Sequence, residues 1–165
     1  MKTIKLIAAS ALLISASTAF SHGNADHKKA EASAVKEQQE WGIAGDAKAV
    51  QRTITLRMTD DMRFTPNHIA VKQGETLRLR VENKGQILHE VVLGTPETLE
   101  AHAQMMVKFP TMEHDEPYMA HVPPGKTGEL LWQFNRPGSF DFACLIAGHF
   151  QAGMRGTITV TPTPK

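Results

Sequence analysis

The chain has 165 residues, which is enough for one domain and hardly enough for two. Its hydrophobic content of 41% is ordinary for a globular protein. The 18 Lys and Arg are balanced by 17 Asp and Glu, so there is no strongly basic composition of the kind that indicates a nucleic-acid partner. The combination of side chains that can bind metals is unusual, with eight Met, eight His and one Cys.

Residues 1–21 have the layout of a secretory signal peptide. Lys2 and Lys5 precede an apolar stretch over 6–16, and small residues follow as far as Ser21. A membrane anchor is the alternative, but this apolar run is shorter than the ~20 residues that a spanning helix needs. The sequence therefore predicts export to the periplasm and a mature protein that is not inserted in the membrane.

Residues 22–49 are predicted to form an N-terminal arm or linker, rich in Ala, Lys, Glu and Gln. Trp41 breaks this polar stretch and is expected to dock onto the domain that follows. His22 and His27 form a candidate N-terminal copper site. If the signal is cut after Ala19, His22 is the third residue, where an imidazole, the amino group and two amides bind Cu(II) in a square plane. A cut two residues later makes His22 the terminus itself, and a solvated tail without metal is the alternative to both.

Residues 50–165 are predicted to be one all-β domain. Short segments with alternating apolar residues are separated by turn signals such as Gln73–Glu75. Strands of this length, each with one apolar face, indicate an antiparallel sandwich or barrel. The predicted strands cover residues 53–58, 69–72, 76–82, 87–93, 128–134, 139–143 and 156–160.

An insertion at about residues 95–124 interrupts these strands. Thr95 is a candidate helix N-cap followed by acidic residues, and Phe109–Pro110 is expected to end the helix. Residues 111–124 contain three Pro and are predicted to be loop. A loop of this length inside a compact domain is usually functional or disordered.

The clearest chemical signal is a loop near the C-terminus. Cys144, His149 and Met154 follow one another at intervals of five residues, and two Gly let such a loop fold its side chains toward one point. A lone Cys in an oxidising compartment has no internal disulfide partner, so it is a metal ligand, a link to another chain or a liability.

His89 lies in an apolar predicted strand, where a charged group would be costly. Two His and a Cys with a long axial Met form a type 1 copper site. Zinc is the main competitor, but Met is a poor ligand for zinc, and structural zinc sites are closed by Cys and His. We therefore predict one copper ion, cycling between Cu(II) and Cu(I), at His89, Cys144, His149 and Met154; the alternative for each side chain is packing in the core.

This Cys–His–Met loop, with its upstream His, resembles the type 1 copper loop of the cupredoxins. The segments Phe64–Pro66, Val71–Thr76 and Asn83–Gly85 match further features of that family, and the resemblance covers roughly residues 50–165. It implies a Greek-key β-sandwich, here with a helical and loop insertion and an extended N-terminal arm.

The insertion and Trp41–Asp46 resemble the CopI-like periplasmic copper-tolerance cupredoxins, which implies a role in copper resistance. The Met and His side chains of the insertion form a candidate second copper site, suited to Cu(I). The alternative is that Met105 and Met106 pack the helix onto the sandwich, because Met fills irregular gaps. The candidate residues are His102, Met105, Met106, Met112, His114, Met119 and His121.

Glu90 departs from the family pattern. Many cupredoxins have Asn directly after the first His ligand, at the position of Glu90. Groups next to the ligands tune the potential and geometry of a metal site. The hypothesis is therefore a distorted, green type 1 centre.

Two functions remain open from the sequence. In copper homeostasis the protein binds copper and sequesters it or passes it to a partner protein. An electron carrier would instead dock redox partners through an apolar patch around His149, formed by Leu145, Ile146, Ala147 and Phe150. An insertion that covers this patch would argue against the carrier. An enzyme is not expected, because there is no His-x-His pair for a trinuclear copper cluster and no catalytic triad or nucleotide motif.

Overall fold

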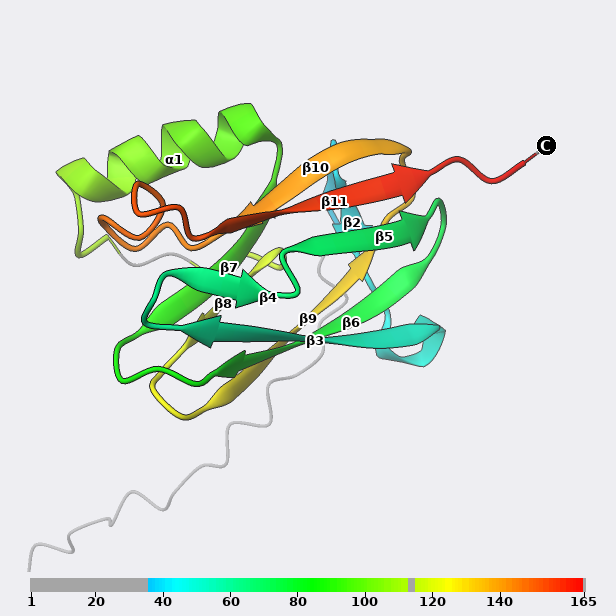
Figure 1. Ribbon diagram of the computed structural model, residues 1–165. Helices are drawn as coiled ribbons and strands as arrows, with labels where there is room; N and C mark the ends of the chain where they lie inside the picture. Colours follow the sequence, from blue (N-terminus) through cyan, green and yellow to red (C-terminus); the bar gives the residue numbers. More distant parts are fainter. Residues whose placement is uncertain (1–35, 113–114, 165) are drawn as a thin grey trace, which may run out of the picture. The chain divides into compact units, whose positions relative to one another are not determined.

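The computed structural model describes residues 36–112 and 115–164. Residues from Val35 onward form one compact unit, in which two β-sheets pack against each other and a helix lies outside them (Figure 1). This confirms the predicted β-sandwich with a helical insertion. The predicted signal peptide and His22, His27 and His114 lie outside the described residues. Among the described residues, no helix combines the length and the apolar character needed to cross a membrane.

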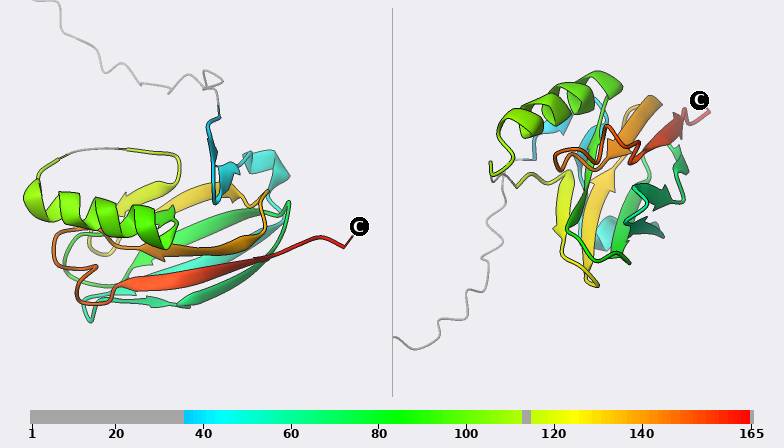
Figure 2. Two further views of the ribbon diagram at one scale, coloured as in Figure 1. Left: turned by 90° about the horizontal axis from the view of Figure 1, so that it is seen from above. Right: turned by 60° about the vertical axis from the view of Figure 1, so that its left-hand side comes forward.

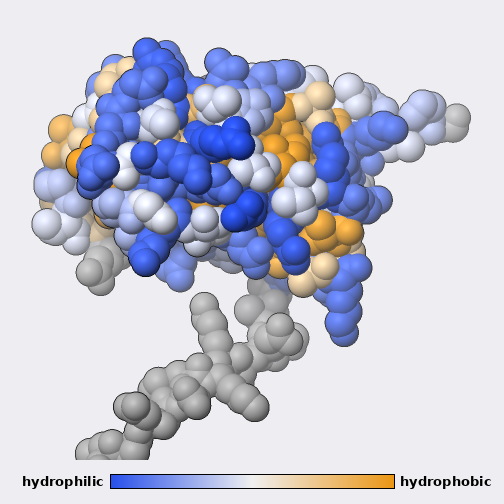
Figure 3. Space-filling model, turned by 60° about the horizontal axis from the view of Figure 1, so that its bottom comes forward, coloured by the Kyte–Doolittle hydropathy of each residue, from blue (hydrophilic) through white to orange (hydrophobic). Residues whose placement is uncertain are grey.

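Alternating burial along the strands builds the core between the sheets. In the last strand Ile158 and Val160 are buried, whereas Thr157 and Thr159 are exposed. The face shown in Figure 3 is mostly polar, with limited hydrophobic areas. The first sheet has the order β1 (Gln38–Gln39), β2 (Gly42–Ala44), β9 (Thr127–Gln133), β6 (Thr76–Asn83), β3 (Arg52–Thr59) and β4 (Arg63–Thr65). The second has the order β5 (His68–Lys72), β11 (Arg155–Thr161), β10 (Gly138–Ala143), β7 (His89–Gly94) and β8 (Met119–Val122).

The pairing of the strands is mixed, not purely antiparallel as expected. Strand β3 runs parallel to β6, and β11 runs parallel to β5. The other paired strands are antiparallel. Apolar alternation indicates which face of a strand is buried, but it carries no information on the direction of the neighbouring strand.

The chain joins the sandwich earlier than residue 50, where the domain was expected to begin. Strand β2 pairs with β9, and a short 3-10 helix, Ala47–Ala49, leads into β3. Trp41 is 6% exposed and belongs to the main core. Its carbonyl accepts a hydrogen bond of 2.9 Å from the indole of Trp132.

Helix α1 (Pro96–Lys108) has the ends predicted for it. Thr95 caps it: its hydroxyl accepts from the backbone N–H of Thr98, whose hydroxyl accepts from that of Thr95. Leu99, Ala103 and Met106 form its buried face. Both views in Figure 2 show the helix lying across one side of the sandwich. It packs against β7 at Val92 and against the end of β10 at Ala143.

Every residue of β7 is buried, because both faces of the strand are covered. Val91 and Leu93 lie in the main core, whereas Val92 packs against α1. The expectation that residues 111–124 are all loop is wrong at β8, which pairs with β7 at the sheet edge. Its signal is weak because only four residues form the strand.

Candidate metal centre

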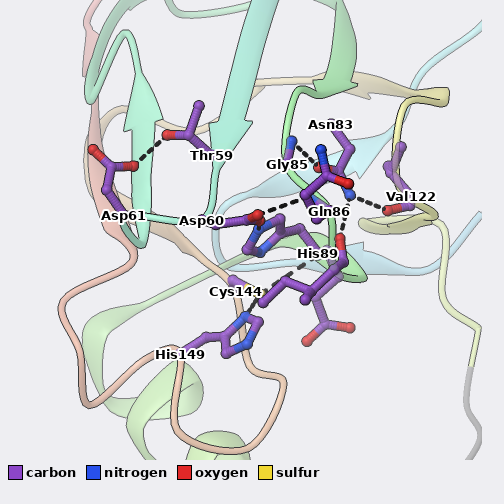
Figure 4. Close-up of polar contacts among 12 residues, drawn as sticks. Thr59, Asp60, Asp61, Asn83, Gly85, Gln86, His89, Val122, Cys144 and His149 are labelled. Atoms are coloured by element: carbon purple, nitrogen blue, oxygen red, sulfur yellow. Dashed lines mark hydrogen bonds and ion pairs between the residues drawn. The ribbon is translucent and has the colours of Figure 1, made fainter.

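His89, Cys144 and His149 meet at one end of the second sheet (Figure 4). His89 begins β7, Cys144 follows the last residue of β10, and His149 lies in the loop between β10 and β11. Their ligand atoms all lie within 4.8 Å of one another, and the Cys144 Sγ is 3.3 Å from the His149 Nδ1. The sequence predicted these three side chains to come together, and the structure places them so.

The backbone of the loop between β10 and β11 brings Met154 back to Cys144. Gly148 and Gly153 adopt φ angles of 90° and 92°, a region that favours glycine. The N–H of Met154 donates to the carbonyl of His149, and the N–H of Cys144 donates to the carbonyl of Met154 over 3.0 Å. Met154 is fully buried and belongs to the same core cluster of buried residues as Cys144.

His89 is fully buried and uses only one ring nitrogen for a hydrogen bond among the described residues. Its Nε2 lies 3.0 Å from the Oδ1 of Asp60, while its Nδ1 is buried without a partner. Buried polar atoms are almost always hydrogen-bonded, so an exception calls for a ligand. The Nδ1 of His89 is therefore the atom to which a metal would bind.

The Cys144 thiol and the His149 ring are both uncharged in the metal-free protein at neutral pH. Burial raises the pKa of the Cys144 thiol to about 12, so the thiol keeps its proton at neutral pH. Burial, followed by the nearby His89, lowers the pKa of His149. A metal cation would therefore replace the proton of the Cys144 thiol and meet an uncharged His149 ring, and thiolate and uncharged imidazole are the ligating forms of these two groups.

Sequence reasoning missed Asp60. It lies in the turn between β3 and β4, and its Oδ2 accepts the backbone N–H of Gln86 over 2.7 Å. This hydrogen bond, and then the His89 ring, lower the pKa of Asp60, so the side chain is a carboxylate at neutral pH. Asp60 and His89 are 29 positions apart in the sequence, and no spacing rule links an acidic turn to that strand.

Glu90 is buried behind the cluster, on the side of the helix. Its Oε1 accepts the backbone N–H of Leu145 over 2.8 Å, and its Oε2 lies 2.8 Å from the Nε2 of His121. Its own backbone N–H lies 3.4 Å from the Sγ of Cys144. The residue that departs from the family pattern thus contacts the Cys144 thiol, the backbone of the next residue and the β8 strand.

The candidate second-site residues divide between a pocket and the helix packing. Met106, Met112 and His121 line a pocket of about 780 Å³ whose wall also includes Glu90. Met106 and Met119 are buried against the sandwich, which is the packing alternative. Met105 is 44% exposed on α1, and His102 is half-buried on the same helix. Of the six candidate residues in the described part of the chain, three therefore line one pocket.

The donor set fits copper. The imidazoles of His89 and His149 and the thiolate of Cys144 would hold a copper ion, and the thioether of Met154 would supply a further, weak ligand. A structural zinc site would instead close its fourth position with Cys or His. No further group of three or more His, Cys, Asp or Glu with metal-binding geometry occurs in residues 36–112 and 115–164.

Known proteins resemble this chain over most of its length. A relative from Rubrivivax gelatinosus is 47% identical over 88% of this chain and 89% of its own. A second, from Pseudomonas aeruginosa, is 35% identical over 75% of this chain and 84% of its own. Both are named copper-resistant cuproprotein CopI.

Solved structures show the same fold. A structure of auracyanin B matches with a TM-score of 0.62 and 22% identity, over 73% of this chain and 96% of that chain. The family model described as a cupredoxin-like domain matches residues 6–160. The chain therefore belongs to the cupredoxin-like family, in agreement with the resemblance of its Cys–His–Met loop.

Proposed function

We propose that this protein binds copper at His89, Cys144, His149 and Met154 and acts in copper tolerance. The observation that carries the proposal is the buried cluster of one thiol and two imidazoles, with the His89 Nδ1 left without a partner. The name of its relatives, copper-resistant cuproprotein, supports the biological role. Copper supplies one-electron chemistry between Cu(I) and Cu(II), and the protein acts as a binding and redox protein, not as an enzyme.

We place this function in the periplasm. Residues 1–21 carry the pattern of a signal peptide, and the single Cys suits a site that the metal protects from oxidation. Copper ions are the first partners, and a protein that accepts copper or electrons from this one is the second. The N-terminal site at His22 and His27 stays a prediction outside the described residues.

The pocket beside α1 is the proposed place of a second copper ion. Met106, Met112 and His121 line it, and thioethers and imidazole suit Cu(I). The pocket shares Glu90 with the type 1 cluster, so the two sites are neighbours. A loaded protein is expected to bind more than one copper ion per chain.

Electron transfer between periplasmic partners is the second candidate, and one observation favours it. Ile87 and Leu88 are 41% and 43% exposed directly before His89, as in an apolar docking surface. The patch expected around His149 is reduced, however, because Leu145 is buried under α1 and Phe150 packs partly against the same cluster. The reduced size of this patch supports copper tolerance as the main role.

The test is to load the protein with excess Cu(II), remove unbound metal, and measure the visible spectrum and the copper content per chain. Wild type and Cys144→Ser are compared, with Met105→Leu as a control on the exposed face of α1. We expect a thiolate-to-copper band in wild type and in the control, and none in Cys144→Ser. Bound copper without this band in wild type would overturn the type 1 assignment.

The role in tolerance needs a test in cells. A strain lacking this gene is grown on copper with wild-type or Cys144→Ser protein supplied from a plasmid. We expect only the wild type to restore growth. Equal growth of both, with equal protein levels, would separate copper tolerance from the Cys144 site and favour the carrier function.

A further inference from the structure

We propose that Asp60 is a positioning residue for the copper site, which fixes the His89 ring with its Nδ1 toward the metal and favours Cu(II) over Cu(I). The proposal rests on the copper assignment made above. Figure 4 shows the arrangement: Asp60 on one side of the His89 ring, and Cys144 and His149 on the other. Among the described residues of the cluster, Asp60 forms a hydrogen bond with His89 alone.

The hydrogen bonds decide which nitrogen of His89 carries the proton. A carboxylate only accepts hydrogen bonds, so the 3.0 Å contact from Asp60 requires a proton on the His89 Nε2. A neutral imidazole has one N–H, and its Nδ1 then presents a lone pair. That nitrogen is the one buried without a partner at the cluster.

The turn after β6 is shaped to receive the Asp60 carboxylate. Asn83 is 1% exposed, and its Oδ1 accepts the N–H of Gly85 over 2.8 Å. Its Nδ2 donates to the carbonyls of Ile87 and Val122, which ties this turn to β8. The N–H of Gln86 then points at Asp60 Oδ2. With both of its oxygens bonded, the carboxylate has a defined orientation.

Gly85 leaves the space that this carboxylate fills. A Cβ built on Gly85 would lie 1.8 Å from the Oδ1 of Asp60, which is far closer than any real contact. Gly85 is not among the residues with positive φ, so its backbone accepts a side chain. Gly85→Ala should therefore fold and push the carboxylate away from His89, without altering either residue.

The chemical consequence follows from charge. A carboxylate bonded to the outer nitrogen of a ligating His fixes the ring and makes it a stronger donor, and loss of such a partner typically lowers metal affinity about 10- to 100-fold. The negative charge stabilises the more highly charged Cu(II) more than Cu(I). Asp60 is 36% exposed, so solvent screens part of the effect and the lower end of this range is expected.

The first experiment needs no copper. In the metal-free protein at about pH 8, where an ordinary imidazole is neutral, nitrogen NMR reports the protonated nitrogen of His89. We expect the Nε2–H form in wild type and in Asp61→Asn, which removes the same charge from the next residue. Asp60→Ala and Gly85→Ala should shift His89 toward a mixture of both forms. An unchanged His89 in Asp60→Ala would overturn the proposal.

The second experiment uses the copper-loaded protein. For Asp60→Ala we expect a roughly tenfold lower affinity for Cu(II) relative to Cu(I), seen as a reduction potential about 59 mV higher. The isosteric Asp60→Asn keeps a hydrogen-bond acceptor, so its reduction potential should rise less, and that of Gly85→Ala should also rise. The double variant Asp60→Ala/Gly85→Ala should have the same potential as Asp60→Ala, because no carboxylate remains for the added Cβ to displace.

The outcomes separate the proposal from the function beneath it. A wild type without a thiolate band would remove the copper assignment, yet the metal-free NMR would still test the contact between Asp60 and His89. Equal shifts in Asp61→Asn and Asp60→Asn would reduce the effect to net charge and overturn the positioning role. The positioning role would also be overturned if Gly85→Ala shifted the reduction potential as much in the Asp60→Ala background as it does in wild type.

Discussion

Cys144 is fully buried, and its thiol is the group of the site that must lose a proton when copper binds. Burial raises its pKa to about 12, and the thiol must lose its proton to bind copper. His149 is already neutral at pH 7, because burial lowers its pKa. We therefore predict that Cu(II) binding at about pH 7 releases close to one proton, and that the apparent affinity rises about tenfold per pH unit while the pH is below the pKa of the Cys144 thiol.

Calorimetry in buffers with different ionisation enthalpies measures this proton release directly. Cys144→Ser is the control, since any Cu(II) that it takes up has no thiol proton to displace. Binding to wild type without proton release would mean that the thiol is already ionised, and that a nearby cation, not described in the structure, lowers its pKa.

A second prediction at the residue scale concerns Glu90 and His121, which lie opposite each other on β7 and β8. The Glu90 side chain is fully buried, whereas that of His121 is 38% exposed. Because a buried carboxylate is costly when a partner is removed, His121→Ala should destabilise the metal-free protein by about 1–3 kcal/mol. The same change should cost less in a Glu90→Gln background, since the charge is gone.

Urea unfolding of the two single variants and the double variant measures this coupling. His68→Ala is a matched control, because His68 is an exposed strand His with a hydrogen bond of 2.8 Å to Thr157. It should change the free energy of unfolding by no more than about 0.5 kcal/mol. Additive effects of the Glu90 and His121 changes would show that the pair is not coupled.

At the scale of elements, two neighbouring Met residues of α1 allow a packing role and a metal-binding role to be tested separately. Met106 is 5% exposed and packs against the sandwich, while the neighbouring Met105 is 44% exposed. Met106→Ala should therefore cost about 2–5 kcal/mol through loss of packing, and Met105→Ala no more than about 0.5 kcal/mol. Urea unfolding of the metal-free variants gives both values.

Copper content completes this comparison. Met106→Leu keeps the volume of the side chain and removes its sulfur, so its stability should stay within about 1.5 kcal/mol of wild type. If the pocket holds a second copper ion, this variant binds less copper per chain than Met105→Leu. Equal copper content in the two Leu variants would leave Met106 with packing alone.

Features that depend on local signals could be predicted from the sequence, whereas features that depend on distant contacts could not. The ends of α1 were predictable because Thr95 and Phe109–Pro110 are local signals. The Cys144–Met154 loop was predictable because its donors are close together in the chain and chemically unusual. The contact of Asp60 with His89 and the covering of Leu145 by α1 depend on how distant segments pack. A short edge strand such as β8 carries too few residues for a periodic signal.

At the scale of the whole molecule, residues 38–49 are part of the sandwich and not a tether. The Trp41 ring meets Tyr118 edge-on at 5.3 Å, and Tyr118 in turn lies 6.0 Å from Trp132. These three aromatic residues join β2, β9 and the segment that leads into β8. The beginning of the domain is thereby linked to the edge of the second sheet, on which His121 lies.

Trp41→Ala should therefore destabilise the entire domain by about 3–5 kcal/mol, because it empties a large buried site. Trp41→Phe should cost much less, since the indole N–H of Trp41 is buried without a hydrogen bond among the described residues and is lost without penalty. Urea unfolding followed by circular dichroism measures both. The copper band, which depends on the other end of β7 and on the β10–β11 loop, should persist in folded Trp41→Ala. If Trp41→Ala unfolds at the same urea concentration as wild type, β1 and β2 contribute nothing to the stability of the core and the domain begins at β3.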